Sequence, residues 1–292
     1  MSKEKTIISL LEEINKNIDN VGSGGSNTNL KELTVTANGE YIPADYGVDG
    51  FSKVTANVNV QKIKVSGIRC SNECLDENGR WQESFIDTSL VSNFSNCFSA
   101  PKLKRLEKIE VTSNATNVAS MFSEANLLEW ADVSDYDFSN VTNLQRMFYN
   151  AYNIDNIDVS RWNVNNVTNI VAMFYNCYKL TKLDLTNWNV GAVTNILQVF
   201  YNCINLVSLV GEKTITEVLD NNISCLNGLK ISSTTMFNNI IRLNRASLRA
   251  LINGLADFTG SNTRTLTLNE SLIAQLTEED IAIATAKNWT IA

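Results

Sequence analysis

The sequence predicts an α/β solenoid that follows an oligomerising helix and a small β module. A 26-residue repeat in the middle of the chain and a heptad pattern at its start carry this prediction. With 292 residues, 44% hydrophobic and 19% charged, the chain can bury a sizeable core in two or three folding units. We expect an oligomerising or docking helix, a flexible linker, the β module, the repeats, and degenerate repeats with a C-terminal cap, at residues 1–21, 22–29, 30–84, 85–212 and 213–292.

The repeat is one motif that recurs at a constant offset. Residues 141–151 read VTNLQRMFYNA, residues 167–177 read VTNIVAMFYNC and residues 193–203 read VTNILQVFYNC, so the offset is 26. Weaker copies begin at Ala115 and Val91. Such a fixed period is typical of a solenoid, because a single unit cannot bury its apolar face alone and stacked neighbours form one continuous core.

Within one copy the hydrophobic periodicity changes from helical to strand-like. Apolar residues at i, i+3 and i+4 spacing between Val141 and Ala151 predict a short helix. Alternation then predicts a strand with Ile157 and Val159 on its inner face. We expect three buried columns and one column of asparagines that satisfy backbone groups at the helix entrance: Phe122, Phe148, Phe174 and Phe200; Tyr136, Trp162 and Trp188; Ala125, Ala151, Cys177 and Cys203; and Asn117, Asn143, Asn169 and Asn195.

These copies closely resemble the BspA-like leucine-rich repeats, whose pattern runs like VTNMxxMFYNCxxLxxLDLSxWxV. The resemblance covers about residues 85–212. It implies a right-handed α/β solenoid used for adhesion or display, on bacterial surfaces and in bacteriophage structural proteins. The pattern departs at Ser123 and Glu124 and breaks after Leu209.

Residues 213–292 are interpreted as degenerate turns that close the solenoid. The pattern predicts a helix over 246–258, a strand over 265–268, and a second helix capped by Thr277 and Asp280 that ends near Lys287. The last of these stretches resembles a C-terminal segment of phage structural proteins with such repeats, although the polar cap that a solenoid needs also explains it.

The first 21 residues carry the spacing of a coiled-coil seam. The a and d positions hold Ile7, Leu11, Ile14, Ile18 and Val21. Leu and Ile at a, with Ile and Val at d, favour trimers or tetramers over dimers, so we expect a homotrimer. The alternative is an amphipathic helix that folds back on its own domain, but the Gly- and Ser-rich linker that follows argues for a separate unit.

Residues 30–84 predict a small β module. A strand over 33–37 meets Asn38-Gly39, a strong two-residue hairpin signal, before a return strand. About 30 residues here resemble a module of tail, baseplate and fibre proteins of tailed bacteriophages, and the whole arrangement is similar to virion surface proteins of crAss-like gut phages. Residues 1–5 lead into an amphipathic pattern, so we expect no secretory signal, and virion assembly in the host cytoplasm would account for this.

Composition excludes several kinds of chemistry. The chain has no His and a formal net charge of −7, which argues against His-based catalysis, His-containing zinc sites and nucleic-acid binding. Its apolar runs are too short to span a bilayer, so we expect no membrane insertion. The cysteines lack metal-ligand spacing, and we expect them to be reduced. We therefore assign no catalytic, cofactor-binding or metal-binding residue.

One strand face is the candidate ligand face, with Trp130, Asp132, Asn156, Asp158, Lys182 and Asp184. An aromatic ring, a cation and a run of acids suit a polar ligand. The three aspartates could instead form a cation-binding ladder, or a solvated face on which mutual repulsion raises their pKa values. The whole face could also be bare, or pack against a neighbouring subunit.

The sequence thus favours a non-enzymatic phage virion protein, a head or tail fibre or decoration protein. We expect it to dock to other virion proteins through its N-terminal region and to bind a host surface molecule or glycan. The alternative is a bacterial cell-surface adhesin with BspA-like repeats. A third class, a depolymerase or glycosidase, would need an unrepeated carboxylate cluster in a cleft, and the acids here follow the repeat.

Overall fold

The computed structural model describes residues 75–81, 88–89, 91–106, 109–231, 233 and 235–292, and the backbone of five strands before residue 88. Strand β1 (Glu32–Val35) pairs in parallel with β3 (Lys53–Ala56). Strand β2 (Gly39–Tyr41) pairs in parallel with β4 (Val60–Lys64), which also pairs with β6 (Ile86–Asp87). The predicted heptad residues and the linker lie outside the described residues.

The hairpin predicted at Asn38-Gly39 is wrong. Strands β1 and β2 belong to two different sheets, and each pairs in parallel with a later strand. Gly39 is itself the first residue of β2, so it cannot serve as half of a two-residue loop. The dipeptide signal is local, whereas the parallel partners come from residues 53–64, which a hairpin rule does not consider.

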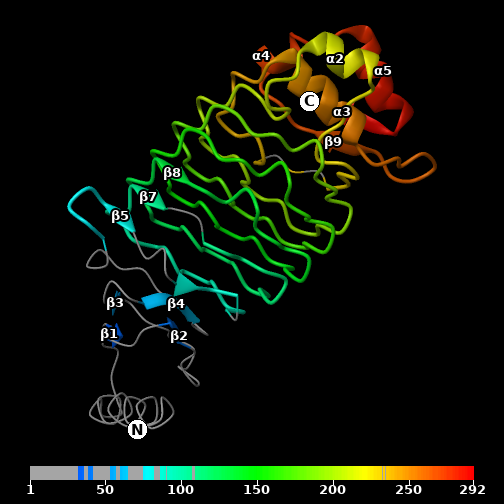
Figure 1. Cartoon of the computed structure of the whole chain (residues 1–292). Helices are drawn as coiled ribbons and strands as arrows, with labels where there is room; N and C mark the ends of the chain where they lie inside the picture. Colours follow the sequence, from blue (N-terminus) through cyan, green and yellow to red (C-terminus); the bar gives the residue numbers. More distant parts are fainter. Residues whose placement is uncertain are drawn as a thin grey trace, which may run out of the picture.

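The repeats form a stack of coils, which we call the repeat stack (residues 91–210). It continues from a parallel sheet of three short strands, β5 (Arg80–Trp81), β7 (Arg105–Leu106) and β8 (Trp130–Ala131). Beyond them, single parallel bridges join Asn156 to Lys182 and Lys182 to Ser208. Figure 1 shows these coils lying one on another between the N-terminal strands and the C-terminal helices.

The short helix predicted over residues 141–151 is wrong, because residues 145–150 form turns and no residue of this segment is helical. Arg146 and Asn150 have φ angles of 55° and 60°, in the left-handed region that interrupts a right-handed helix. The Phe148 amide donates to the Met173 carbonyl of the next coil at 2.8 Å, where a helix would bond within itself. Repeated tight turns also return every third or fourth side chain to the interior, which explains the misleading periodicity.

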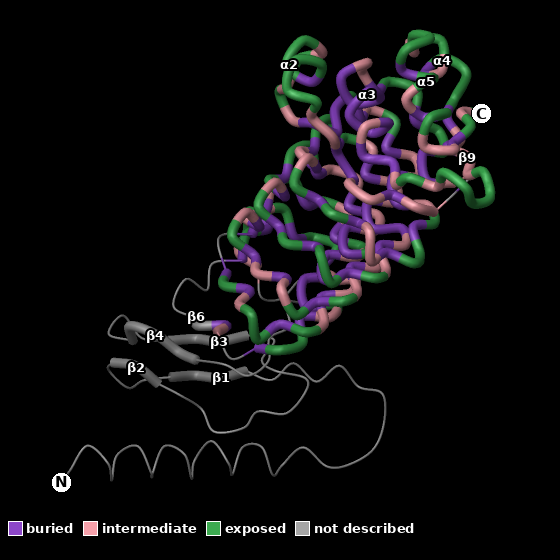
Figure 2. Tube along the Cα trace, turned by 90° about the vertical axis from the view of Figure 1, so that its right-hand side faces the viewer, coloured by how far each residue is buried: buried purple, intermediate pink, exposed green. Residues whose placement is uncertain are grey.

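The aromatic columns predicted as core are confirmed. Every Phe from Phe122 to Phe200 in its column is at most 1% exposed, and neighbouring rings stack at 5.1, 5.6 and 5.7 Å. Trp162 and Trp188 are also buried, and their indole N–H groups donate to the carbonyls of Val133 and Val159 at 2.7 and 3.1 Å. Figure 2 shows the buried residues running through the interior of the stack.

The Ala and Cys column fills a small buried slot, as predicted. Cys177 and Cys203 are free thiols with no exposed surface. Each Sγ donates to a backbone carbonyl, of Phe148 at 3.2 Å and of Phe174 at 2.9 Å. Burial is the main cause that raises the pKa of the Cys177 thiol, so this cysteine stays protonated and serves as packing.

The C-terminal region closes the stack with helices. These are α2 (Ile215–Asp220), α3 (Arg245–Gly254), α4 (Glu270–Ile273) and α5 (Glu278–Ala286), with β9 (Arg264–Leu266) parallel to β10 (Trp289–Ile291). The capping box of Thr277 and Asp280 on α5 is confirmed. Helix α3 ends four residues earlier than predicted, at Gly254, where a Cβ would lie 2.0 Å from the Cys225 carbonyl oxygen.

A buried charge cluster ties α3 to α5. The Arg249 guanidinium pairs with Asp280 at 2.7 Å and with Glu279 at 3.0 Å, and the Asp280 side chain has no exposed surface. Burial acts to raise the pKa of Asp280, but the hydrogen bonds from Thr277 and Arg249 together hold this pKa below its usual range. The carboxylate therefore stays charged, and it takes part in both the capping box of α5 and the ion pair with Arg249.

Candidate functional site

A polar groove of about 650 Å³ lies where the regular repeat ends. One wall comes from residues 155–160 and 181–184 of two neighbouring coils, and the other from residues 211–213 and from Glu217 in α2. We call it the strand-face groove. Its lining residues are Asp155, Asn156, Ile157, Asp158, Ser160, Thr181, Lys182, Leu183, Asp184, Gly211, Glu212, Lys213 and Glu217.

The alternation of each strand segment aims its polar side chains into the groove. Ile157 and Leu183 are at most 4% exposed and anchor their segments in the core. Asn156 and Lys182, which directly precede them, face solvent. The parallel bridge from Asn156 to Lys182 sets the two coils side by side. The groove floor is therefore a direct consequence of the 26-residue register.

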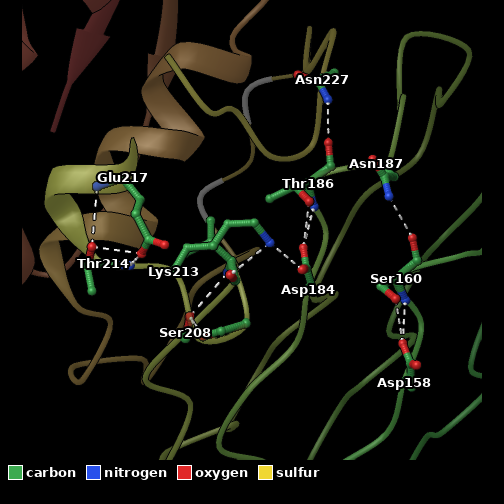
Figure 3. A network of polar contacts seen from close by, with 12 residues as sticks. Asp158, Ser160, Asp184, Thr186, Asn187, Ser208, Lys213, Thr214, Glu217 and Asn227 are labelled. Carbon is green, nitrogen blue, oxygen red and sulfur yellow. Dashed lines mark hydrogen bonds and ion pairs between the residues drawn. The ribbon is translucent and has the colours of Figure 1, made fainter. Parts of the chain in front are cut away.

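Each aspartate of the face holds the turn that follows it. Asp158 Oδ1 accepts from the Ser160 amide at 3.0 Å and the Ser160 hydroxyl at 2.6 Å. Asp184 Oδ1 does the same for Thr186, at 3.1 and 2.6 Å. Figure 3 shows that one oxygen of each carboxylate is committed to these local bonds. These aspartates therefore stabilise the backbone turns that follow them, as expected of Asp in turns.

The second wall is held by two ion pairs. Lys213 Nζ lies 2.5 Å from Asp184 Oδ2, with both side chains about a quarter to a third exposed, and Lys182 Nζ lies 2.6 Å from Glu212 Oε1 near solvent. Gly211, with a φ of 62°, lets the chain turn back over Asp184, since a Cβ there would lie 3.3 Å from it. These pairs join the last regular coil to the loop before α2.

Two groove carboxyls have pKa values below their usual range. Partial burial acts to raise the pKa of Asp184, but the hydrogen bonds from Lys213 and Thr186 outweigh it. The predicted raising of pKa by repulsion along the column is therefore wrong for Asp184, because Lys213 provides a nearer opposite charge. The pKa of Glu217 is lowered mainly by the backbone hydrogen bond from Thr214, within the capping box of α2.

Four of the six predicted ligand-face residues come together in this groove: Asn156, Asp158, Lys182 and Asp184. The other two do not. The Trp130 ring is covered by the Arg105 guanidinium, 4.1 Å from the ring centroid, and Asp132 holds Ser134 at 2.9 Å. Arg105 and Trp130 lie in register on paired strands, which explains their contact.

Sequence reasoning missed the residues of the second wall. Glu212, Lys213 and Glu217 have no equivalent in earlier coils, because they follow the point where the repeat breaks. The break itself, at Val210-Gly-Glu-Lys, was a usable signal. The chain turns back over Asp184 at Gly211, and this brings Glu212 to Lys182 and Lys213 to Asp184.

The groove offers five carboxylates and two lysines, along with Ser, Thr and Asn side chains. In the described ranges, no three His, Cys, Asp or Glu side chains are arranged to hold a metal ion. Both lysines are paired, so the groove can accept hydrogen bonds and attract a cationic or hydroxylated ligand. Of the helices that the structure describes, none has the length and apolarity to cross a bilayer.

Comparison with known families finds one match. Residues 49–155 and 116–233 both match the family described as "Mycoplasma protein of unknown function, DUF285". The two stretches overlap, as expected when a family pattern fits a repeated sequence in more than one register, and together they span more than half of the chain. No curated protein and no solved structure matches the chain significantly.

Proposed function

The chain belongs to the family described as Mycoplasma protein of unknown function, DUF285, and we propose that it is a non-enzymatic attachment module. In this proposal the repeat stack is a right-handed solenoid of the BspA-like leucine-rich-repeat type, with tight turns in place of the expected short helices. Its strand-face groove binds a polar group on a partner surface. The observation that carries the proposal is the groove itself, where four predicted ligand-face residues meet the loop before α2.

Binding fits the groove chemistry better than hydrolysis does. A glycosidase needs one carboxyl with a raised pKa as general acid. The pKa values of Asp184 and Glu217 are both lowered, so neither carboxyl suits the role of general acid. Both also carry a structural task, in the ion pair with Lys213 and in the cap of α2. We therefore propose that the acids bind and position a partner.

Two kinds of protein could use such an attachment module. The N-terminal and C-terminal resemblances to phage proteins support a virion fibre or decoration protein. In this proposal it assembles in the host cytoplasm as a homotrimer and docks to other virion proteins through its N-terminal region, residues 1–21. The family description names Mycoplasma, and this observation favours the alternative, a bacterial cell-surface adhesin. The attachment role of the stack is common to both proposals.

A blocking substitution tests the groove. Lys182→Trp places a large side chain at an exposed groove position, and Asn165→Trp adds the same ring to an exposed position outside the groove. We expect Lys182→Trp to abolish adsorption of the labelled full-length chain to a panel of bacterial and epithelial cells that bind the parent protein. Asn165→Trp should leave adsorption unchanged. Equal adsorption of both variants and the parent would remove the groove from the proposal.

A further inference from the structure

A second surface of the repeat stack consists of stacked tyrosines on the turn segments. Five of the eight tyrosines of the chain lie there, and all five are partly exposed. We call the surface the tyrosine ridge. It has three parallel columns, Tyr149, Tyr175 and Tyr201; Asn150, Asn176 and Asn202; and Tyr152, Tyr178 and Ile204.

The tyrosine rings repeat at the spacing of the coils. In the first column the ring centroids are 4.9 and 4.7 Å apart, and Tyr152 and Tyr178 are 5.3 Å apart. The rings are within 20° of parallel, so neighbours cover each other's faces. The ridge therefore presents ring edges and phenol hydroxyls. In the described part of the chain, no protein group hydrogen bonds to any of these five hydroxyls, which face solvent.

A line of asparagine amides runs between the two tyrosine columns. Asn176 Nδ2 donates to Asn150 Oδ1, and Asn202 Nδ2 to Asn176 Oδ1, both at 2.8 Å. Each amide can donate two hydrogen bonds and accept two, so about half of this capacity remains for a ligand. Because each Asn is held at a φ of 60° and bonded to its neighbours, the row is rigid before any ligand binds.

The charge pattern of the ridge selects the kind of partner. None of the nine side chains in the three columns is charged, although the chain has a formal net charge of −7. A nucleic acid or an anionic membrane surface would need clustered Lys or Arg. Ile204, which occupies the third column, is 45% exposed and adds apolar surface to the hydroxyls and amides. The combination fits an uncharged chain that is polyhydroxylated and carries C–H faces.

We propose that the tyrosine ridge binds a linear, neutral polysaccharide that lies along the axis of the stack. Sugar hydroxyls pair with the phenol hydroxyls and the free amide positions, while sugar C–H groups pack on ring edges and on Ile204. The regular interval of about 5 Å between coils suits a polymer with its own regular repeat. This proposal rests on the proposed attachment function, but it assigns glycan contact to a surface separate from the strand-face groove.

Affinity electrophoresis of the full chain tests the ridge, with hydroxyethylcellulose, mannan or a linear β-1,3-glucan in the gel and carboxymethylcellulose as the charged comparison. We expect retardation by at least one neutral polymer and not by carboxymethylcellulose. Replacing Tyr175 and Tyr178 together by Phe keeps the stacked rings and removes two hydroxyls, so affinity should fall by about tenfold. Replacing both by Ala should remove retardation, and circular dichroism establishes whether each variant is folded.

The groove variant Lys182→Trp separates this proposal from the proposed function. It should leave retardation by the neutral polymer unchanged. If Lys182→Trp abolishes retardation and the Phe pair does not, the groove is the glycan site and the ridge proposal is wrong. No retardation by any neutral polymer also overturns it. A ridge variant that changes only the sedimentation coefficient shows that the ridge contacts a second copy of the chain, which likewise contradicts the proposal.

Discussion

The repeat stack and the C-terminal region solve the same problem, the burial of an apolar face, by different means. Residues 91–210 contain no helix in the part that the structure describes, and identical side chains stack coil on coil. Residues 213–292 use capped helices and a buried charge cluster between α3 and α5. In the stack every coil supplies the partner for the next, whereas the last coil has none and must be covered by a different structure.

The difference lies in where the polar groups find partners. In the stack, backbone amides bond to the neighbouring coil, and Asn and Asp side chains bond to local turns. In the C-terminal region the helices satisfy their own backbone, and one carboxylate, Asp280, both caps α5 and pairs with Arg249. A periodic structure spreads its stability over many similar contacts, while its cap concentrates stability in a few.

The largest effect is expected inside the stack. Phe174→Ala removes a buried ring that stacks on Phe148 and Phe200, and it should lower the free energy of unfolding by about 3–5 kcal/mol. Phe174→Leu keeps most of the volume and should cost clearly less. Chemical denaturation of both variants measures the difference, and equal small losses would mean that the column does not carry the core.

Asp280→Asn tests whether the stability of the C-terminal region depends on a few strong contacts. It leaves Arg249, whose side chain is 9% exposed, without its buried partner, and should cost about 3 kcal/mol. Glu279→Gln changes a 71% exposed partner of the same arginine and should cost far less. Hydrogen exchange of Asp280→Asn should show faster exchange of backbone amides in residues 245–292 and no change in the repeat stack. Equally faster exchange in both regions would contradict their separate stabilisation.

The same residue gives the cap a pH dependence. The folded pKa of Asp280 is lowered, so its contribution is present above the unfolded value of about 3.9 and is lost as the pH falls through the folded pKa. The parent protein should therefore lose stability in the C-terminal region below about pH 4. Asp280→Asn should show a flatter pH profile there, and an identical profile would exclude this carboxylate as the cause.

Asn176 tests the left-handed turns of the stack. At a φ of 60°, Ala is strained and also breaks the amide row to Asn150 and Asn202, so Asn176→Ala should cost about 2 kcal/mol. Asn176→Gly breaks the row without the strain and should cost about 1 kcal/mol less than Ala. Thermal melting compares the pair, and an Ala variant as stable as the Gly variant would argue against strain.

Asp158→Asn is expected to have the smallest effect. The amide oxygen of Asn can still accept both hydrogen bonds from Ser160, so stability should change by less than about 0.5 kcal/mol. Asp158→Ala removes the acceptor and should cost about 1 kcal/mol. If the Asn variant were the more damaging of the two, charge at this position would matter more than turn geometry.

Sequence periodicity was most informative where a column repeats. The buried Phe, Trp and Ala or Cys columns and the inward Ile157 could be read from a 26-residue offset, because equivalent positions in stacked coils share one environment. The same offset placed Asn156 beside Lys182. It failed for the conformation of residues 141–151, because tight turns and a helix both return side chains to one face every three or four residues.

The sequence alone determined which residues enter the core, the register of the coils and the capping box of α5, since each depends on a local pattern or a constant offset. Only the tertiary structure decided which strands pair near the N-terminus, which carboxylates are paired and where the groove lies. Those features depend on residues that meet without a shared period, such as Lys213 with Asp184 and Asp280 with Arg249. The number of residues between the partners of each pair depends on how the C-terminal region covers the last coil. No repeating sequence pattern encodes that number.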